Sequence, residues 1–180
     1  MPSIIVVTGL PCTGKTTLSR WLACQLHFPL IHKDGIKEIL FDTLGWGDVD
    51  WSKRLSGASV ELFFHIAEAV LVGGSSLILE SNFDPQLALP RFRQLEECSG
   101  TGIIQVCCTA SIETILQRFQ ARSGSRHPGH GDDLYLQEFK TRVKQNRPMA
   151  MEIGTLIEVD TTDFQQVAYE HILELVKAHL

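Results

Sequence analysis

Short, continuous apolar runs alternate along the chain with longer stretches in which apolar residues recur every three or four positions. Runs rich in valine, isoleucine and leucine are typical of strands that are buried on both faces of a parallel sheet. They occur at residues 4–7, 28–32, 76–80, 102–108 and 156–160. We predict a β-strand at each.

The stretches between these runs follow the helical period of 3.6 residues. After the first run, Leu18, Trp21, Leu22 and Leu26 share one face. A long helix is predicted at residues 58–72, stopped by Gly73-Gly74, with an inner face formed by Leu62, Ile66, Ala69 and Val70. Further helices are predicted from residue 36, at 90–97, after a Ser111 N-cap, at 134–147 and at 164–180.

The element order is therefore β-α-β-α-α-β-α-β-α-α-β-α, which predicts an α/β fold with a five-stranded parallel sheet and helices on both faces. The chain has 180 residues, of which 44% are hydrophobic. This length suits one domain spanning residues 1–180. We find no internal repeat, low-complexity tract or interdomain linker.

Residues 43–57 are predicted to be a loop because glycine, aspartate and serine are frequent there. The loop contains Trp46 and Trp51. These side chains either line a substrate pocket or cover the core, and the sequence favours neither interpretation.

Composition disfavours several classes of binding partner and indicates a cellular compartment. There are 16 Lys and Arg residues against 21 Asp and Glu residues, a net charge of −5, which disfavours general binding to nucleic acid or to an anionic membrane. No apolar run approaches the roughly 20 residues of a membrane span, and no basic, signal-like N-terminus is present. The five cysteines lack disulfide or metal spacing. We expect reduced thiols in a cytoplasmic protein that is a monomer or homodimer.

The turn after the first predicted strand, residues 9–16, matches the P-loop pattern G-x-x-x-x-G-K-[ST]. Gly9 and Gly14 permit backbone angles at which successive N–H groups turn inward around a phosphate. The helix that follows adds its positive dipole end. Lys15 supplies a cation for the β and γ phosphates, and the Thr16 hydroxyl supplies a ligand for Mg²⁺.

We therefore expect ATP and Mg²⁺ as cofactors, with Thr16 as the metal ligand. The expected nucleotide-binding residues of this turn are Gly9, Pro11, Cys12, Thr13, Gly14, Lys15, Thr16 and Thr17. Oxidation of Cys12 would block phosphate binding, although a tolerated small residue explains that position as well.

Asp34 follows the second predicted strand, at the sheet edge where ligands bind in open α/β folds. A carboxylate there can accept the proton of a substrate hydroxyl as it attacks the γ phosphate. The alternative is that Asp34 caps the next helix. Nearby, Lys33 and Lys37 either hold an anionic substrate or are solvated surface charges.

Arg118, Arg122 and Arg126 are spaced four residues apart and lead into a glycine-rich stretch. A basic helix end followed by a flexible loop suits a lid, at about residues 118–133, that brings charge to the transition state. An exposed basic helix face is the alternative. His127 and His130 have a spacing found in zinc sites but no further ligands nearby, so we interpret them as lid residues.

Polar residues also follow the third and fifth predicted strands. Glu80, Asn82 and Asp84 could order Mg²⁺ through water or contact substrate, although polar residues are expected wherever a strand ends. Residues 160–162 are a candidate edge of the adenine pocket.

Together the P-loop, the acid after strand two, the spaced lid arginines and the final Val159-Asp160-Thr161 resemble the small P-loop kinases of the nucleoside-monophosphate-kinase-like superfamily. The chain is most similar to the bacterial AAA-type phosphotransferases, a group that includes zeta toxins, chloramphenicol phosphotransferase, gluconate kinase and the polynucleotide kinase domain. The resemblance implies a three-layer P-loop NTPase sandwich with strand order 2-3-1-4-5 and a lid.

The resemblance also implies phosphoryl transfer from ATP with Mg²⁺. Asp34 would be the base, Arg118 would lie near the adenine or the phosphates, and Arg122 and Arg126 would stabilise charge. Glu80 departs from the aspartate that many relatives have at the end of strand three. We see no paired arginine site of the kind that nucleoside-monophosphate kinases use on a nucleotide acceptor.

The sequence thus predicts an ATP-dependent kinase that phosphorylates a hydroxyl of a small molecule. The alternatives are a polynucleotide 5′-hydroxyl kinase, which the acidic composition disfavours, and a non-catalytic ATP-binding regulatory module. Acceptor specificity is expected to lie in residues 35–60 and 82–93.

Overall fold

The computed structural model describes residues 1–122, 124, 126–131, 136–145 and 149–180. Its strands are β1 (Ser3–Thr8), β2 (Leu30–His32), β3 (Leu77–Glu80), β4 (Gly102–Thr109) and β5 (Thr155–Asp160). Its α-helices are α1 (Lys15–Leu26), α2 (Lys33–Leu44), α3 (Val49–Val72), α4 (Pro85–Ser99), α5 (Ile112–Arg122), α6 (Leu136–Lys144) and α7 (Tyr169–Lys177). Short 3₁₀ turns lie at Pro128–His130 (η1) and Phe164–Gln166 (η2).

The five strands form one sheet in the order β2-β3-β1-β4-β5, and every neighbouring pair is parallel. This confirms the predicted fold and strand order. In the register, Val7 of β1 lies opposite Glu80 of β3, and Glu80 lies opposite His32 of β2. The chain therefore leaves three adjacent strands at the same level of the sheet.

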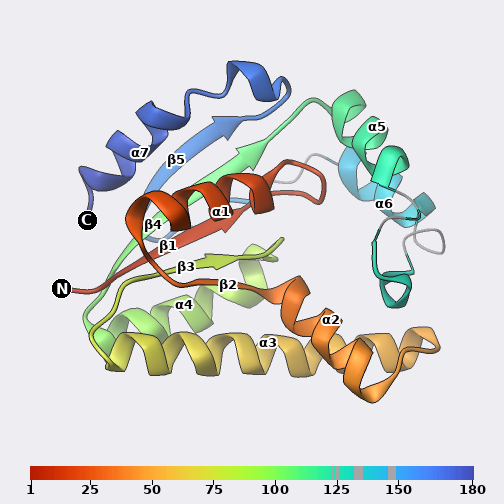
Figure 1. The fold of residues 1–180 in the computed structure, drawn as a ribbon, viewed down its shortest axis with the longest axis horizontal. Coiled ribbons are helices and arrows are strands. Elements are labelled where there is room, and N and C mark those ends of the chain that lie inside the picture. The colour runs from red at the N-terminus through yellow and green to blue at the C-terminus, as the bar shows by residue number, and fades with distance from the viewer. Residues whose placement is uncertain (123, 125, 132–135, 146–148) are drawn as a thin grey trace.

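Helices cover both faces of this sheet (Figure 1). On one face, Ile4 and Val6 pack into a core with α3 and α4, built largely from phenylalanine and leucine. On the other face, Ile5 and Val7 pack with α1 and α7. The alternation of side chains along a strand explains how one apolar run supplies two cores.

Helices α5 and α6 lie beyond the carboxyl ends of the strands (Figure 1). They form a third core, in which Phe119 and Phe139 stack with ring centroids 4.1 Å apart. Leu10, from the turn after β1, also belongs to this core. The arginine-bearing helix is thereby fixed beside the P-loop.

The predicted loop at 43–57 is wrong over its second half, because α3 begins at Val49. Asp48 caps this helix by accepting a hydrogen bond of 2.8 Å from the backbone N–H of Trp51. The Asp-Val-Asp-Trp stretch is therefore a helix start rather than a turn. Trp46 is 55% exposed, and the Trp51 indole donates to the Gly45 carbonyl at 3.0 Å.

The predicted inner face of this helix is wrong at three of its four positions, because Leu62, Ile66 and Ala69 are exposed, whereas Val70 packs against the core. The side chains that are buried in the core are Phe63, Phe64, Ala67 and Leu71. Two adjacent apolar stripes share this helix, so its period alone does not decide which stripe meets the sheet.

The predicted helix at 164–180 is wrong in its first turns, where η2 precedes α7. Asp163 accepts a hydrogen bond from the Gln165 N–H and so favours a separate turn. The predicted helix 90–97 is longer than expected, since Asp84 caps α4 ahead of Pro85. Both ends of the predicted helix 134–147 lie outside the described residues.

The expectation that no stretch approaches a membrane span is wrong for α3, which among the described residues is long and apolar enough to cross a membrane, judged by length and composition alone. In the fold it packs against α2, α4, β2 and β3 and forms part of the helical layer over the sheet.

Gln105 is a buried polar residue of β4 that holds the loop before β5. Its side-chain amide donates to the carbonyls of Met151 and Ile153, and its carbonyl oxygen accepts from the Met151 N–H at 2.8 Å. The amide therefore satisfies three backbone groups of a loop that packs against the sheet.

We predict that Gln105→Leu lowers the free energy of unfolding by about 1–3 kcal/mol, because a buried N–H and two carbonyls lose their partner. Urea denaturation measures the change. Gln117→Leu, on the exposed face of α5, is the control and should stay within about 0.5 kcal/mol of the parent. Equal stability of the two variants would contradict the assignment.

Candidate active site

The turn between β1 and α1 has the backbone geometry of a phosphate cradle. The φ angles of Gly9, Cys12 and Gly14 are 140°, 69° and 78°. A Cβ on Gly9 would lie 2.2 Å from the carbonyl oxygen of Cys108, and one on Gly14 would lie 2.5 Å from the ring of Phe164. Both glycines are therefore required by space as well as by conformation.

Hydrogen bonds hold this turn in shape from within. The Leu10 carbonyl accepts from Thr13 Oγ1 at 2.8 Å and from Lys15 Nζ at 2.8 Å. Thr161, in the loop after β5, places its hydroxyl 2.8 Å from the Thr13 carbonyl. The P-loop is thus preorganised before any ligand binds.

Lys15 is buried, with its ammonium group inside the turn. Burial lowers the pKa of Lys15, although Glu80, Cys108, Asp34 and Cys12 partly oppose that shift. A buried cation whose present partner is a neutral carbonyl gains strongly from an incoming anion.

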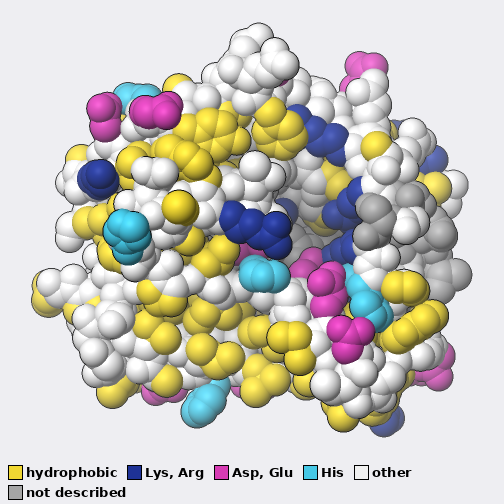
Figure 2. Space-filling view, viewed as in Figure 1, with side chains coloured by type: hydrophobic (Ala, Val, Ile, Leu, Met, Phe, Trp, Pro, Cys, Tyr) yellow, Lys and Arg dark blue, Asp and Glu magenta, His cyan; other side chains and the backbone are white. Residues whose placement is uncertain are grey.

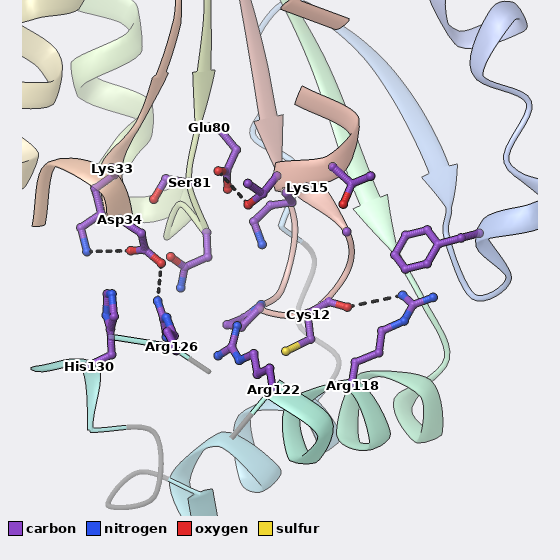
Figure 3. Close-up of a pocket in the computed structure, with 16 residues that line it drawn as sticks. Cys12, Lys15, Lys33, Asp34, Glu80, Ser81, Arg118, Arg122, Arg126 and His130 are labelled. Atoms are coloured by element: carbon purple, nitrogen blue, oxygen red, sulfur yellow. Dashed lines mark hydrogen bonds and ion pairs between the residues drawn. The ribbon is translucent and has the colours of Figure 1, made fainter. Parts of the chain in front are cut away.

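Thr16 and Glu80 form an oxygen pair beside Lys15. The Thr16 hydroxyl donates to Glu80 Oε2 at 3.1 Å (Figure 3). Burial raises the pKa of Glu80, and the Asp34 charge adds to that rise, against the opposing effects of Lys15, Thr16 and His32. A hydroxyl and a carboxylate are ligands that suit Mg²⁺, so this pair fits such a cation.

Asp34 lies in the first turn of α2 and does not cap it. The cap is His32, whose Nδ1 accepts from the Gly35 N–H at 3.1 Å. The Asp34 carboxylate instead pairs with Arg126 and, at 3.5 Å, with Lys33 (Figure 3). The helix-cap alternative for Asp34 is therefore wrong.

The charges around Asp34 decide its ionisation. Desolvation raises the pKa of Asp34, but Arg126, Lys33, His130 and Lys15 together outweigh it and lower the pKa to about 2. In this arrangement the carboxylate is ionised but a weak base.

Arg118 holds together the two loops at the far end of the site. Its guanidinium donates to the carbonyls of Thr161 and Thr162, at 2.6 and 3.1 Å, and to that of Cys12 at 3.4 Å. It also lies over the ring of Phe164, 3.8 Å from the centroid. Arg118 thus forms an aromatic and cationic wall beside the P-loop.

These groups line one cavity of about 430 Å³. Most of the predicted site residues meet there, namely Pro11, Cys12, Gly14, Lys15, Thr16, Thr17, Asp34, Arg118, Arg122 and Arg126. Gly9 and Thr13 shape the turn without lining the cavity. The surface view shows Lys and Arg side chains gathered around the opening (Figure 2).

A second cavity, of about 1070 Å³, adjoins the first. Lys33, Ser81 and Asn82 line both. The second cavity extends between α3 and the start of α4 and reaches Thr141 in α6. Trp46 and Trp51 line neither cavity, and they are not part of the buried core.

Comparison with known proteins identifies the family of this chain and solved structures that resemble it. The AAA domain family matches residues 4–146, a range that includes the P-loop, Asp34 and the lid arginines. The chain belongs to the AAA domain family. A crystal structure described as a "putative kinase" from Chloroflexus aurantiacus j-10-fl is 39% identical, with a TM-score of 0.88 over 99% of this chain and 98% of that one.

More distant structures share the fold of this AAA domain. A sugar kinase from Janibacter sp. HTCC2649 is 16% identical, with a TM-score of 0.62, and a gluconokinase from Sinorhizobium meliloti 1021 is 17% identical, with a TM-score of 0.61. Each match covers 99% of this chain and 94% of the other. None of the curated proteins compared with the chain matches it.

Three residues that line this AAA domain's cavity were not predicted as site residues, namely Ser81, His130 and Phe164. Phe164 was predicted only as the first residue of a helix, although an aromatic residue directly after a polar strand exit is a usable signal. His130 reaches the cavity only because the lid packs back on α2, a tertiary contact that its local sequence does not encode.

The described end of the predicted lid, residues 126–131, docks on α2 through one ion pair and two histidine–carboxylate contacts. Asp34, Glu38 and Asp42 are spaced four residues apart on this helix and pair with Arg126, His130 and His127, respectively. The histidine distances are 2.9 Å to Glu38 and 3.2 Å to Asp42. We name these three acids the acidic edge of α2.

Ring packing adds to this docking. The His127 ring stacks on Phe41 with centroids 5.0 Å apart, and the His130 ring meets Phe41 edge-on at 5.4 Å. A Cβ on Gly129 would lie 2.7 Å from the Phe41 ring. No cluster of three or more potential metal ligands occurs among the described residues, and both histidines contact carboxylates instead.

Lys37 does not face either cavity. It donates to Ser52 Oγ at 3.1 Å, and the Ser52 hydroxyl donates to the Gly129 carbonyl at 3.3 Å. Burial and neighbouring Lys33 lower the pKa of Lys37 to about 8. Lys37 is therefore neither a solvated surface charge nor a wall of the described cavities.

The lowered pKa of Asp34 makes a prediction about acid stability. Because its folded-state pKa lies below the ordinary 3.8, its stabilising effect is present above about pH 4 and is lost as the pH falls toward 2. We predict that Asp34→Asn removes this part of the pH dependence. Thermal unfolding midpoints measured from pH 2 to 6 would show the difference between parent and variant shrinking at the acid end. A difference that stays constant over that range would contradict the ion pair.

Proposed function

We propose that this AAA domain is an ATP-dependent kinase that transfers the γ phosphate of ATP to a hydroxyl of a small molecule. One observation carries the proposal. A P-loop cradle after β1 and an ionised carboxylate after β2, two strands away in the sheet, line one cavity, and that cavity adjoins a second one large enough for an acceptor.

The nucleotide side of the proposal follows from the chemistry of the lining. The inward-turned amides and Lys15 would bind the phosphates. Thr16 would hold Mg²⁺ directly, with Glu80 accepting hydrogen bonds from its water ligands. Bound Mg²⁺ would draw charge off the β and γ phosphate oxygens. Arg118 and Phe164 would lie beside the nucleoside.

On the acceptor side, Asp34 would accept the hydroxyl proton while the acceptor oxygen bonds to the γ phosphorus. The bond from that phosphorus to the bridging oxygen of ADP breaks in the same transfer. Arg122 and Arg126 would stabilise the charge on the transferring group.

The Arg126–Asp34 pair couples these roles. With Arg126 in place, the pKa of Asp34 is about 2, too low for an effective base. An incoming triphosphate competes for Arg126 and would draw it away. Loss of that neighbouring cation would raise the pKa of Asp34 at the stage when a base is needed.

The first test is an acceptor screen read as ADP release, across antibiotics, sugars, nucleosides and a 5′-hydroxyl oligonucleotide. Lys15→Ala is predicted to lower turnover by roughly 10²–10³-fold, because the transition state loses a buried cation. Lys53→Ala removes an exposed lysine and is the matched control. Equal turnover of Lys15→Ala and the parent would contradict the proposal.

The second test separates the base from nucleotide binding. Asp34→Asn is predicted to lower kcat by about 10²–10⁴-fold, since the amide cannot accept the proton, while a fluorescent ATP analogue still binds. Asp50→Asn, at an exposed position in the first turn of α3 and outside both cavities, is the control. ATP binding with no product from any acceptor, unaffected by Asp34, would instead favour a regulatory ATP-binding module.

A further inference from the structure

The second cavity provides information about the acceptor, on the basis of the proposed function. It meets the nucleotide cavity at Lys33, Ser81 and Asn82, and Asp34 directly follows Lys33 in the first turn of α2. A hydroxyl group that enters from the second cavity therefore arrives on the Asp34 side of the P-loop. The bulk of the acceptor remains between α3 and α4.

The wall of this cavity contains three phenylalanine rings. Phe63 meets Phe64 edge-on with centroids 5.4 Å apart, and it meets Phe83 at 5.7 Å. Val60, Met149 and Ala88 add aliphatic surface. These groups offer no hydrogen bonds, so a sugar covered with hydroxyls would bury them unpaired against this wall.

The cations on the wall already have partners. Lys33 donates to Ser56 Oγ at 3.1 Å and pairs with Asp34 at 3.5 Å. Arg91 binds Glu61 through two hydrogen bonds, of 2.8 and 3.1 Å, and packs over the Phe64 ring.

The remaining charged group among the described lining residues is the acid Asp84. An anionic acceptor would therefore compete with carboxylates that Lys33 and Arg91 already contact, and would bring a second negative charge near Asp84. Uncharged polar contacts are available from the side chains of Ser56, Ser81, Asn82, Gln86, Thr141 and Gln145, which also line the cavity.

The volume of the second cavity favours a bulky acceptor. Sites for drug-sized ligands span roughly 300–1,000 Å³, and this cavity of about 1070 Å³ lies at the upper end. We propose that the acceptor is an uncharged hydroxyl compound with a bulky apolar ring body, and that sugar acids and phosphorylated sugars are not acceptors.

A neutral fluorescent probe, N-phenyl-1-naphthylamine, tests the cavity without any phosphoryl transfer. We expect saturable binding to the full chain. Val60→Asp should weaken binding of the probe by about tenfold or more, because the substitution places a charged carboxylate in the apolar wall, where the probe would desolvate it. Leu62→Asp is the matched control, since Leu62 lies two residues along the same helix, is 40% exposed and does not line the cavity.

Leu87→Asp is a second test variant in case Val60→Asp does not fold. Leu87 lines the cavity but is 76% exposed, so a charge is tolerated there. This variant should weaken probe binding with an unchanged unfolding midpoint. Probe binding that is absent, or equal in all of these variants and the parent, would overturn the assignment of this cavity.

Acceptor activity supplies the second readout. Among uncharged hydroxyl compounds with ring bodies, those that support ADP release should displace the probe, and Val60→Asp should raise their KM with little change in kcat. ADP release with gluconate or a sugar phosphate, and with no ring-bodied compound, would overturn this inference and leave the kinase proposal standing. A cavity that binds the probe as expected, without ADP release from any acceptor, would overturn the kinase proposal and with it the acceptor assignment.

Discussion

The site depends on the central strand β1, which is buried and hydrogen-bonded to a parallel neighbour on each side. At the carboxyl end of this strand the chain turns sharply into α1. That turn needs positive φ angles at three positions and becomes the cradle of inward-facing amides. The same register puts Glu80 beside β1 and brings His32, and hence Asp34, to the next strand along.

Charge in this cradle is balanced by groups that can exchange partners. Lys15 is bonded to a loop carbonyl, Thr16 to Glu80, and Arg126 to Asp34. In each of these contacts, one group is suited to bind a phosphate or a cation. Its present partner in the protein can release it. A site of this kind is shaped in advance but is not fully satisfied electrostatically, so an anion with its cation has several favourable contacts to gain.

The parts that could be predicted from sequence are those set by local signals. The buried runs predicted the strands, and the glycine spacing predicted the turn, because backbone conformation restricts residue choice there. Asp34 was predicted to lie in the site because parallel strands end at the same edge. The start of α3 was missed because Asp48 and Gly57 are residue types that are common in loops. In the structure, Asp48 caps the helix and Gly57 lies within it.

Other features arise from contacts between distant segments. The inner face of α3 depends on where the sheet lies. The second cavity combines side chains of α3, of the start of α4 and of Thr141, Gln145 and Met149, and none of these segments has a binding pattern alone. The predicted lid was located through its arginines, but its docking on the acidic edge of α2 required the tertiary structure.

The acidic edge has a consequence for how this protein can change over time. Helix α2 carries the proposed base and also the partners of His127 and His130, and its first residue, Lys33, borders the proposed acceptor cavity. A substitution that reshapes this helix for a new acceptor would also alter how residues 126–131 dock on it. Under the proposed function, selectivity and turnover would be inherited together, and adaptation to a new compound would be expected to begin at cavity-lining positions of α3 and α4, such as Val60 and Leu87, rather than on α2 or at Ser52.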